Sequence, residues 1–302
     1  MNNNTHSYID DERNKSVYIN INGELLKRSQ AKISVFDSGF LLGDGVWEGI
    51  RLYNNKLVFK EEHLKRLYYG IQKLEIDMSI NQKELENNIY KTIQVNKMDT
   101  DVHIRLIVTR GLKKTPFQHP SANIGKANII IIPEYKIADP KMYKKGVKLV
   151  SVSTIRSIPE IQDPKINSLS KFNCIQACIE ASNKGGDEGL MNDINGNIST
   201  CNSTNFFMIK NNVVITSKGN YCLNGVTRQN IINLCKENSI SIILKDFKIN
   251  DVYAADAAFV TGTFAGVIPV TQIDCYKFNP KNFNIIDMLF KLYKQKIKLL
   301  YS

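Results

Sequence analysis

The sequence predicts an α+β or mixed α/β protein built from two domains. Its 302 residues are enough for two hydrophobic cores. A content of 43% hydrophobic and 23% charged residues is ordinary for a globular protein. Stretches with strand and helix periodicity are mixed along the chain without strict strand–helix–strand alternation, which argues against a dinucleotide-binding sheet.

The first half of the chain predicts hairpins followed by helices and further strands. A strand over 17–20 ends at Asn22-Gly23, a pair that favours a tight hairpin turn. A second strand pair flanks Asn54-Asn55. Beyond it, apolar residues at helical spacing predict one buried helix face per segment. The remaining predicted segments are helices from residue 60 and over 82–97, and strands over 102–109 and 127–132.

A change in composition between Pro133 and Lys145 marks the predicted linker, because prolines and lysines interrupt the periodicity there. In the part beyond the linker, the patterns predict helices over 172–183, 227–237 and 284–300, with strands and hairpin turns between them. The expected organisation is a disordered tail over 1–15, a small N-terminal α/β domain over 16–133, a linker over 134–145 and a larger C-terminal domain over 146–302.

Composition excludes several functional classes. The net charge of +11 is spread along the chain, so neither nucleic acid nor a membrane surface is an expected partner. No apolar run reaches the roughly 18 residues that a membrane helix needs. The polar N-terminus lacks the apolar core of a secretory signal, so a cytoplasmic location is expected.

The six cysteines all lie in the second half of the chain. Cys174 and Cys178 are four residues apart on a predicted helix and therefore share a face. Two further zinc ligands at a suitable spacing are not found near them. In a reducing compartment the thiols are expected to be buried structural residues, and no metal site is predicted.

Five short motifs follow one another along the chain. They cover residues 36–51, 62–67, 104–111, 223–228 and 261–270. In their order and spacing they resemble the class IV, or fold-type IV, pyridoxal-phosphate aminotransferases, which include branched-chain and D-amino-acid aminotransferases. The resemblance spans about residues 17–273 and implies a two-domain fold-type IV architecture like that of D-amino-acid aminotransferase.

The resemblance also implies a cup for the phosphate of pyridoxal phosphate. Free N–H groups at a helix start suit an anion, and an arginine fork matches phosphate geometry. The expectation is therefore pyridoxal phosphate bound in a non-standard way, with another phosphate-bearing ligand, or none, as the alternatives. The residues that match the cup are Arg66, Leu223, Gly225, Val226, Thr227, Gly262 and Thr263.

The sequence departs from this family at two catalytic positions. Asn167 stands where the family keeps the lysine that forms a Schiff base with the cofactor and moves the substrate α-proton. An amide is not nucleophilic and has no useful basicity near neutral pH. Thr200 stands where the family keeps the glutamate that holds a proton on the pyridine nitrogen, and a hydroxyl cannot hold that proton.

Lys171 offers a replacement for the missing amine. It lies four residues after Asn167, where the family often has a tyrosine that touches the phenolic oxygen of the cofactor. One hypothesis is therefore that the Schiff-base lysine has moved to position 171. The alternatives are a surface lysine in a first helical turn and a counter-ion for phosphate.

Three functional classes remain open at this point. The first is an enzyme of altered chemistry that acts on a small amino acid, amine or keto acid, with or without the cofactor. The second is a transaminase that uses Lys171, and the third is a non-catalytic relative, a pseudoenzyme, that binds a phosphate-bearing ligand or a partner subunit. Trp47, His103 and Arg105 match the family's substrate pocket. The resemblance further implies a homodimer.

Overall fold

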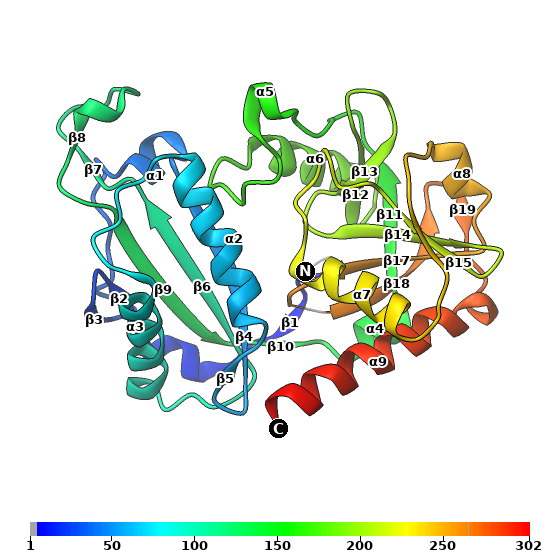
Figure 1. The fold of residues 1–302 in the computed structure, drawn as a ribbon, viewed down its shortest axis with the longest axis horizontal. Helices are drawn as coiled ribbons and strands as arrows, with labels where there is room; N and C mark the ends of the chain where they lie inside the picture. Colours follow the sequence, from blue (N-terminus) through cyan, green and yellow to red (C-terminus); the bar gives the residue numbers. More distant parts are fainter. Residues whose placement is uncertain (1–4, 265) are drawn as a thin grey trace.

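The computed structural model describes residues 5–264 and 266–302, and its elements are arranged around two sheets (Figure 1). Residues 1–4, which belong to the expected N-terminal tail, and residue 265 lie outside the described part. One sheet is built from the N-terminal half of the chain and the other from the C-terminal half. Each sheet has its own group of buried apolar side chains.

The N-terminal sheet has six antiparallel strands in the order β3-β2-β9-β6-β4-β5. Asn22 and Gly23 both have positive φ, as the predicted hairpin turn requires. The strands are β2 (Tyr18–Ile21), β3 (Glu24–Lys27), β4 (Gly45–Tyr53), β5 (Lys56–Leu57), β6 (Val102–Thr109) and β9 (Asn128–Tyr135).

Three helices accompany this sheet: α1 (Ser38–Leu42), α2 (Lys60–Lys73) and α3 (Gln82–Val95). The α2 helix buries Leu64, Leu67 and Ile71, the stripe expected from the sequence. Asn81 begins α3 with a reciprocal capping box to Glu84. Both helices are therefore positioned by the apolar periodicity that predicted them.

The C-terminal sheet is mixed, because β11 runs parallel to both β12 and β18 while most other pairs are antiparallel. Its order is β13-β12-β11-β18-β17-β14-β15-β16, with β19 paired to β18. The strands are β11 (Val147–Ser151), β12 (Glu188–Asn192), β13 (Ile198–Cys201), β14 (Asn205–Lys210), β15 (Val213–Thr216), β16 (Ile242–Leu244), β17 (Ala257–Gly262), β18 (Gly266–Ile273) and β19 (Tyr276–Lys277).

Helices surround this second sheet, and α9 runs along its lower side in Figure 1. Phe206, Phe207 and Phe259 are fully buried in its core, where the Phe207 and Phe259 rings stack with centroids 4.7 Å apart. The helices are α4 (Lys141–Lys145), α5 (Pro159–Gln162), α6 (Phe172–Asn183), α7 (Val226–Glu237), α8 (Ile249–Tyr253) and α9 (Asn284–Tyr301).

The remaining short elements connect and cover the two halves. They are β1 (Tyr8–Ile9), β7 (Leu112–Lys113), β8 (Asn123–Ile124), β10 (Ile137–Ala138) and the 3-10 helices η1 (Glu12–Ser16), η2 (Pro120–Ala122) and η3 (Pro280–Asn282). Strand β1 pairs with β10 in the region expected to be the linker. Within the tail expected over 1–15, residues 8–9 therefore form a strand and η1 begins at residue 12. No sequence pattern indicated the strand, because backbone pairing needs no apolar pattern.

The segment before α6 joins the two halves. The Trp47 N–H donates to the Asn167 carbonyl at 2.9 Å, and the Leu169 N–H donates to the Gly45 carbonyl at 2.9 Å. These bonds lay residues 167–169 along β4 of the other sheet. They place Asn167 at the boundary between the halves.

Two properties of the surface bear on the sequence predictions. Cys178 and Cys275 are exposed and Cys174 is partly exposed, so the expectation of buried thiols is wrong for these three. The α6 helix carries both Cys174 and Cys178, at the spacing that puts them on one face. Within the described ranges, no helix has the length and apolar character needed to cross a membrane.

Candidate active site

A cavity of about 380 Å³ is lined from both halves of the chain, and this volume is typical of a small-molecule site. Every site residue proposed from the sequence lines it. The structure therefore brings together Trp47, Arg66, His103, Arg105, Asn167, Lys171, Thr200, Leu223, Gly225, Val226, Thr227, Gly262 and Thr263. Their individual roles remain predictions.

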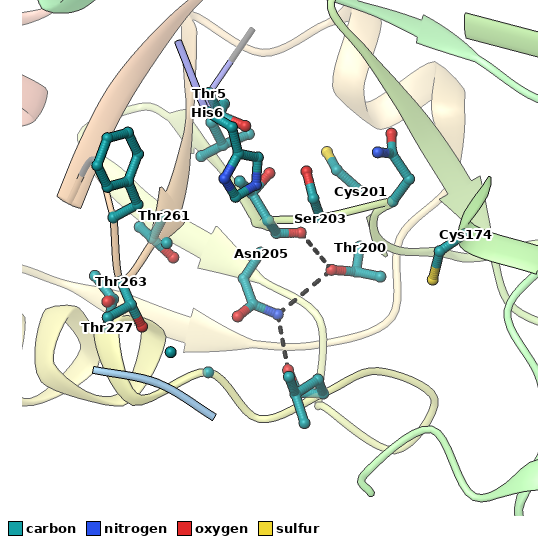
Figure 2. A pocket seen from close by; sticks show the side chains of 18 of the residues that line it. Thr5, His6, Cys174, Thr200, Cys201, Ser203, Asn205, Thr227, Thr261 and Thr263 are labelled. Atoms are coloured by element: carbon teal, nitrogen blue, oxygen red, sulfur yellow. Dashed lines mark hydrogen bonds between the residues drawn. The ribbon is translucent and has the colours of Figure 1, made fainter. Parts of the chain in front are cut away.

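The predicted phosphate cup lies at the start of α7. Gly225 is the N-cap, and no side chain caps the free N–H groups of the first turn. A Cβ at Gly225 would lie 2.2 Å from Asn205 Oδ1, so only glycine keeps this backbone in place. Figure 2 shows Thr227 and Thr263 together on one side of the cavity. The cup thus offers free amides and two hydroxyls.

Arg66 is held at the cup by a buried carboxylate. Its Nε and Nη2 donate to the two oxygens of Glu48, both at 2.7 Å, and its Nη1 donates to the Asn224 carbonyl at 3.1 Å. His63 Nδ1 lies 2.7 Å from Glu48 Oε2. Burial alone would raise the pKa of Glu48, but Arg66 and His63 lower it to about 2. Glu48 is therefore a carboxylate at neutral pH and fixes the direction of the guanidinium.

Lys171 lies beside Asn167, the residue that the sequence resemblance aligns with the family lysine. Its Nζ donates to Asn167 Oδ1 at 3.2 Å, and the Asn167 amide donates to the Trp47 carbonyl at 2.7 Å. Burial lowers the pKa of Lys171 to about 8, and the charges of Arg156 and Arg66 act in the same direction. Lys171 lines the cavity and is thus not the surface lysine that was the alternative.

Thr200 is engaged in a small polar network on the cavity wall (Figure 2). Its hydroxyl donates to the Thr204 carbonyl at 2.7 Å and accepts from the Asn205 amide at 3.4 Å. Asn205 also donates to the Leu223 carbonyl at 2.9 Å, next to the cup. The single hydroxyl proton of Thr200 is used in the hydrogen bond to Thr204. Thr200 therefore cannot take the place of a carboxylic acid at this position.

The predicted substrate residues Trp47, His103 and Arg105 place one positive charge, that of Arg105, on the cavity wall. The Arg105 guanidinium lies 3.7 Å from the centre of the Trp47 ring. His103 is buried, and its Nδ1 has no hydrogen-bond partner in the described part of the chain. Burial, followed by the charges of Arg51 and Arg105, lowers the pKa of His103 well below its usual value. His103 is therefore a neutral imidazole.

Several cavity residues were not predicted from the sequence. Thr5 and His6 line the cavity, and the Thr5 hydroxyl donates to the buried carboxylate of Glu188. Arg156 and Cys174 line it as well. No local motif points to these four residues, because loop and strand packing brings them to the cavity.

The residues present suit the phosphate of pyridoxal phosphate and offer an amine for its aldehyde. Gly225 leaves the space that a Cβ would fill, and the buried Thr261 hydroxyl, which lines the cavity, has no partner among the described residues. The cup, Arg66 and Thr263 would hold the phosphate, and Lys171 would supply the amine. The bound cofactor would supply an electron-withdrawing ring.

Changing Gly225 to alanine should weaken the binding of pyridoxal phosphate by at least about 10-fold, because the new methyl group displaces Asn205 and with it the cup. Gly262→Ala is the comparison within the same predicted cup, and it should lose less affinity. Its Cβ would meet only the Thr204 methyl group, at an ordinary 3.5 Å. Titration of Trp47 fluorescence measures both variants, and equal affinities would contradict the proposed cup.

The comparison with known families agrees with this geometry. Residues 45–273 match the family described as amino-transferase class IV. The chain belongs to the class IV aminotransferases. The expected fold-type IV architecture is also confirmed: the crystal structure of the branched-chain amino acid aminotransferase of Escherichia coli matches at a TM-score of 0.83 and 26% identity, covering 92% of this chain and 95% of that one.

Two sequence relatives are similar to this member of the class IV family. It is 34% identical to a putative branched-chain-amino-acid aminotransferase of Methanocaldococcus jannaschii, over 93% of this chain and 95% of that protein. It is also 35% identical to branched-chain-amino-acid aminotransferase-like protein 1 of Arabidopsis thaliana, over 84% of this chain. The chain spans only 46% of that plant protein.

Proposed function

We propose that this chain is a pyridoxal-phosphate enzyme of altered chemistry that acts on the amino group of a small amino acid or amine, or on the matching keto acid, with Lys171 as the amine that bonds to the cofactor. The observation that carries the proposal is the position of Lys171 Nζ, 3.2 Å from the Asn167 amide oxygen and on the cavity wall. A pKa of about 8 supports it, because about a tenth of the amine is then uncharged at pH 7, far more than for an ordinary lysine.

The chemistry assigned to this chain's residues is limited. Lys171 would be the amine offered to the cofactor aldehyde, whose oxygen would leave as water, and its Nζ would hold or return a proton when a substrate amine has taken its place. The cup and Arg66 would keep the phosphate fixed. Thr200 would leave the pyridine nitrogen of the ring unprotonated. We therefore propose that the ring withdraws electrons more weakly than in relatives that have a carboxylate at this position.

Reduction with borohydride in the presence of pyridoxal phosphate tests this proposal. We expect a pyridoxyl group on the peptide that contains Lys171, identified by mass spectrometry, and an absorbance band that shifts when an amine is added. A label on another lysine would reject Lys171. A colourless protein that binds phosphate ligands without turnover would instead support the non-catalytic alternative.

We also propose that the chain forms a homodimer, as the family resemblance implies. An exposed apolar stripe on α6 supports this: Phe172 is 71% exposed, Ile175 is 55% exposed and Ile179 is 56% exposed, and their spacing puts them on one face. Sedimentation equilibrium should give twice the mass of one chain, and a monomer at micromolar concentration would contradict the proposal. The cytoplasmic location expected from the sequence also stays a proposal.

A further inference from the structure

We propose that Arg156 binds a negatively charged oxygen that enters the cavity in addition to the phosphate in the cup. The inference deepens the proposed function and rests on it for the identity of the molecules that bind there. The oxygen belongs either to the phenolic group of the cofactor or to a carboxylate of the substrate. Both are oxyanions that a guanidinium binds through paired N–H groups.

The first argument is the incomplete bonding of a buried arginine. Arg156 is only 7% exposed. Its Nη1 donates to Cys174 Sγ at 2.7 Å, but a thiol sulfur is a weak acceptor. Its Nε has no partner in the ranges that the structure describes. A buried cation without a carboxylate is unfavourable, and an anion from the ligand would offset that loss.

The second argument is the contrast with Arg66. Both arginines line the cavity, but Glu48 already neutralises Arg66. Among the described residues that line the cavity there is no aspartate and no glutamate, whereas Arg105 adds a second arginine charge beside Arg156. No carboxylate in this lining therefore balances the charge of Arg156.

The third argument is position. The Arg156 backbone N–H donates to the Asn192 carbonyl at the end of β12, and its Nη1 lies 2.7 Å from Cys174 Sγ. Figure 2 shows Cys174 on the side of the cavity opposite Thr227 and Thr263. An anionic group at Arg156 would therefore lie at the other side of the cavity from the phosphate in the cup.

Three variants test this inference: Arg156→Leu removes the charge, Arg156→Lys keeps the charge without the fork, and Cys174→Ala keeps the guanidinium without its sulfur contact. Trp47 is the single tryptophan and lines the cavity, so its fluorescence reports binding. One arm compares pyridoxal phosphate with its 3-deoxy analogue. The second arm titrates glutarate and pentanoate into the cofactor-loaded protein by calorimetry.

We expect Arg156→Leu to weaken binding by about 10- to 100-fold in one arm, the range for a lost hydrogen bond to a charged group. A loss confined to pyridoxal phosphate assigns the phenolic oxygen, and a loss confined to glutarate assigns a substrate carboxylate. Arg156→Lys should lose less affinity than Arg156→Leu. Cys174→Ala should bind as tightly as the unchanged protein. If Arg156→Leu does not fold, the comparison of Arg156→Lys with Cys174→Ala decides.

Two results would overturn the inference. One is unchanged affinity in both arms for the arginine variants. The other is an equal loss in Cys174→Ala and the arginine variants, since Arg156 would then only support α6. Failure of the proposed function is recognised separately, because it would leave Lys171 unlabelled by borohydride in the unchanged protein whatever Arg156 binds.

Discussion

Replacing Lys171 with methionine should abolish the covalent attachment of pyridoxal phosphate and lower any turnover by at least about 1000-fold, a loss typical of removing a nucleophile and proton carrier. Methionine keeps the length and apolar stem of the side chain, so the fold should be preserved. Borohydride labelling followed by peptide mapping measures the attachment, and a coupled assay measures turnover.

Two control variants sharpen this prediction. Lys165→Met removes the other lysine of the same segment, which lies outside the cavity lining, and should leave the labelling of Lys171 unchanged. In the double variant Asn167→Lys with Lys171→Met, the amine returns to the family position, and labelling should reappear there. Persistent labelling of the single Lys171→Met variant would show that another amine serves the cofactor.

The labelling rate should also follow the protonation of Lys171. Burial lowers the pKa of this amine from its ordinary 10.5 to about 8. Below that pH the ammonium form dominates and cannot attack, so the rate should rise with pH and reach half its maximum near pH 8. A half-maximum near 10.5 would identify an exposed lysine as the reacting group.

The second large effect is expected at Glu48. Glu48→Gln keeps the shape of the side chain but leaves Arg66 without its carboxylate in a buried site. Breaking such a pair from one side costs about 3–5 kcal/mol of unfolding free energy. Urea denaturation measures the loss, and Glu62→Gln, an exposed carboxylate on α2, is the matched control. Equal stability of the two variants would contradict the structural role of Glu48.

The pH dependence of stability gives an independent check. The pKa of Glu48 is depressed from its ordinary 4.5 to about 2, so its contribution is complete above the unfolded pKa and is lost as the pH falls through the folded one. The unfolding free energy should therefore fall by about 3 kcal/mol between about pH 5 and about pH 2. Glu48→Gln should lack this part of the pH dependence.

Much of the architecture could be predicted from local patterns. The apolar stripe of α2, the Asn22-Gly23 turn and the uncapped start of α7 each depend on a few neighbouring residues. Through the family resemblance, the motif that contains Gly225 and Thr227 named residues that line one end of the cavity. Arg66 was predicted in the same way and also lines the cavity, while its role stays a prediction.

Other parts depend on contacts between distant segments. The structural role of Glu48 depends on Arg66 and His63. Only the packing of α2 on β4 brings their nitrogens within 2.7 Å of the Glu48 oxygens. Arg156 and Thr5 reach the cavity from loops and a terminal segment without periodicity. The pairing of β1 with β10 uses backbone groups, so the side chains of the first residues carried no signal of it.

The hydrogen bond from Arg66 to the Asn224 carbonyl crosses between the two halves of the chain. Arg66 belongs to α2 and Asn224 directly precedes the N-cap of α7, so a phosphate bound by both the guanidinium and the start of α7 would add a second connection between the two halves. Ligand binding would then stabilise the contact between the halves, and ligand release would weaken it.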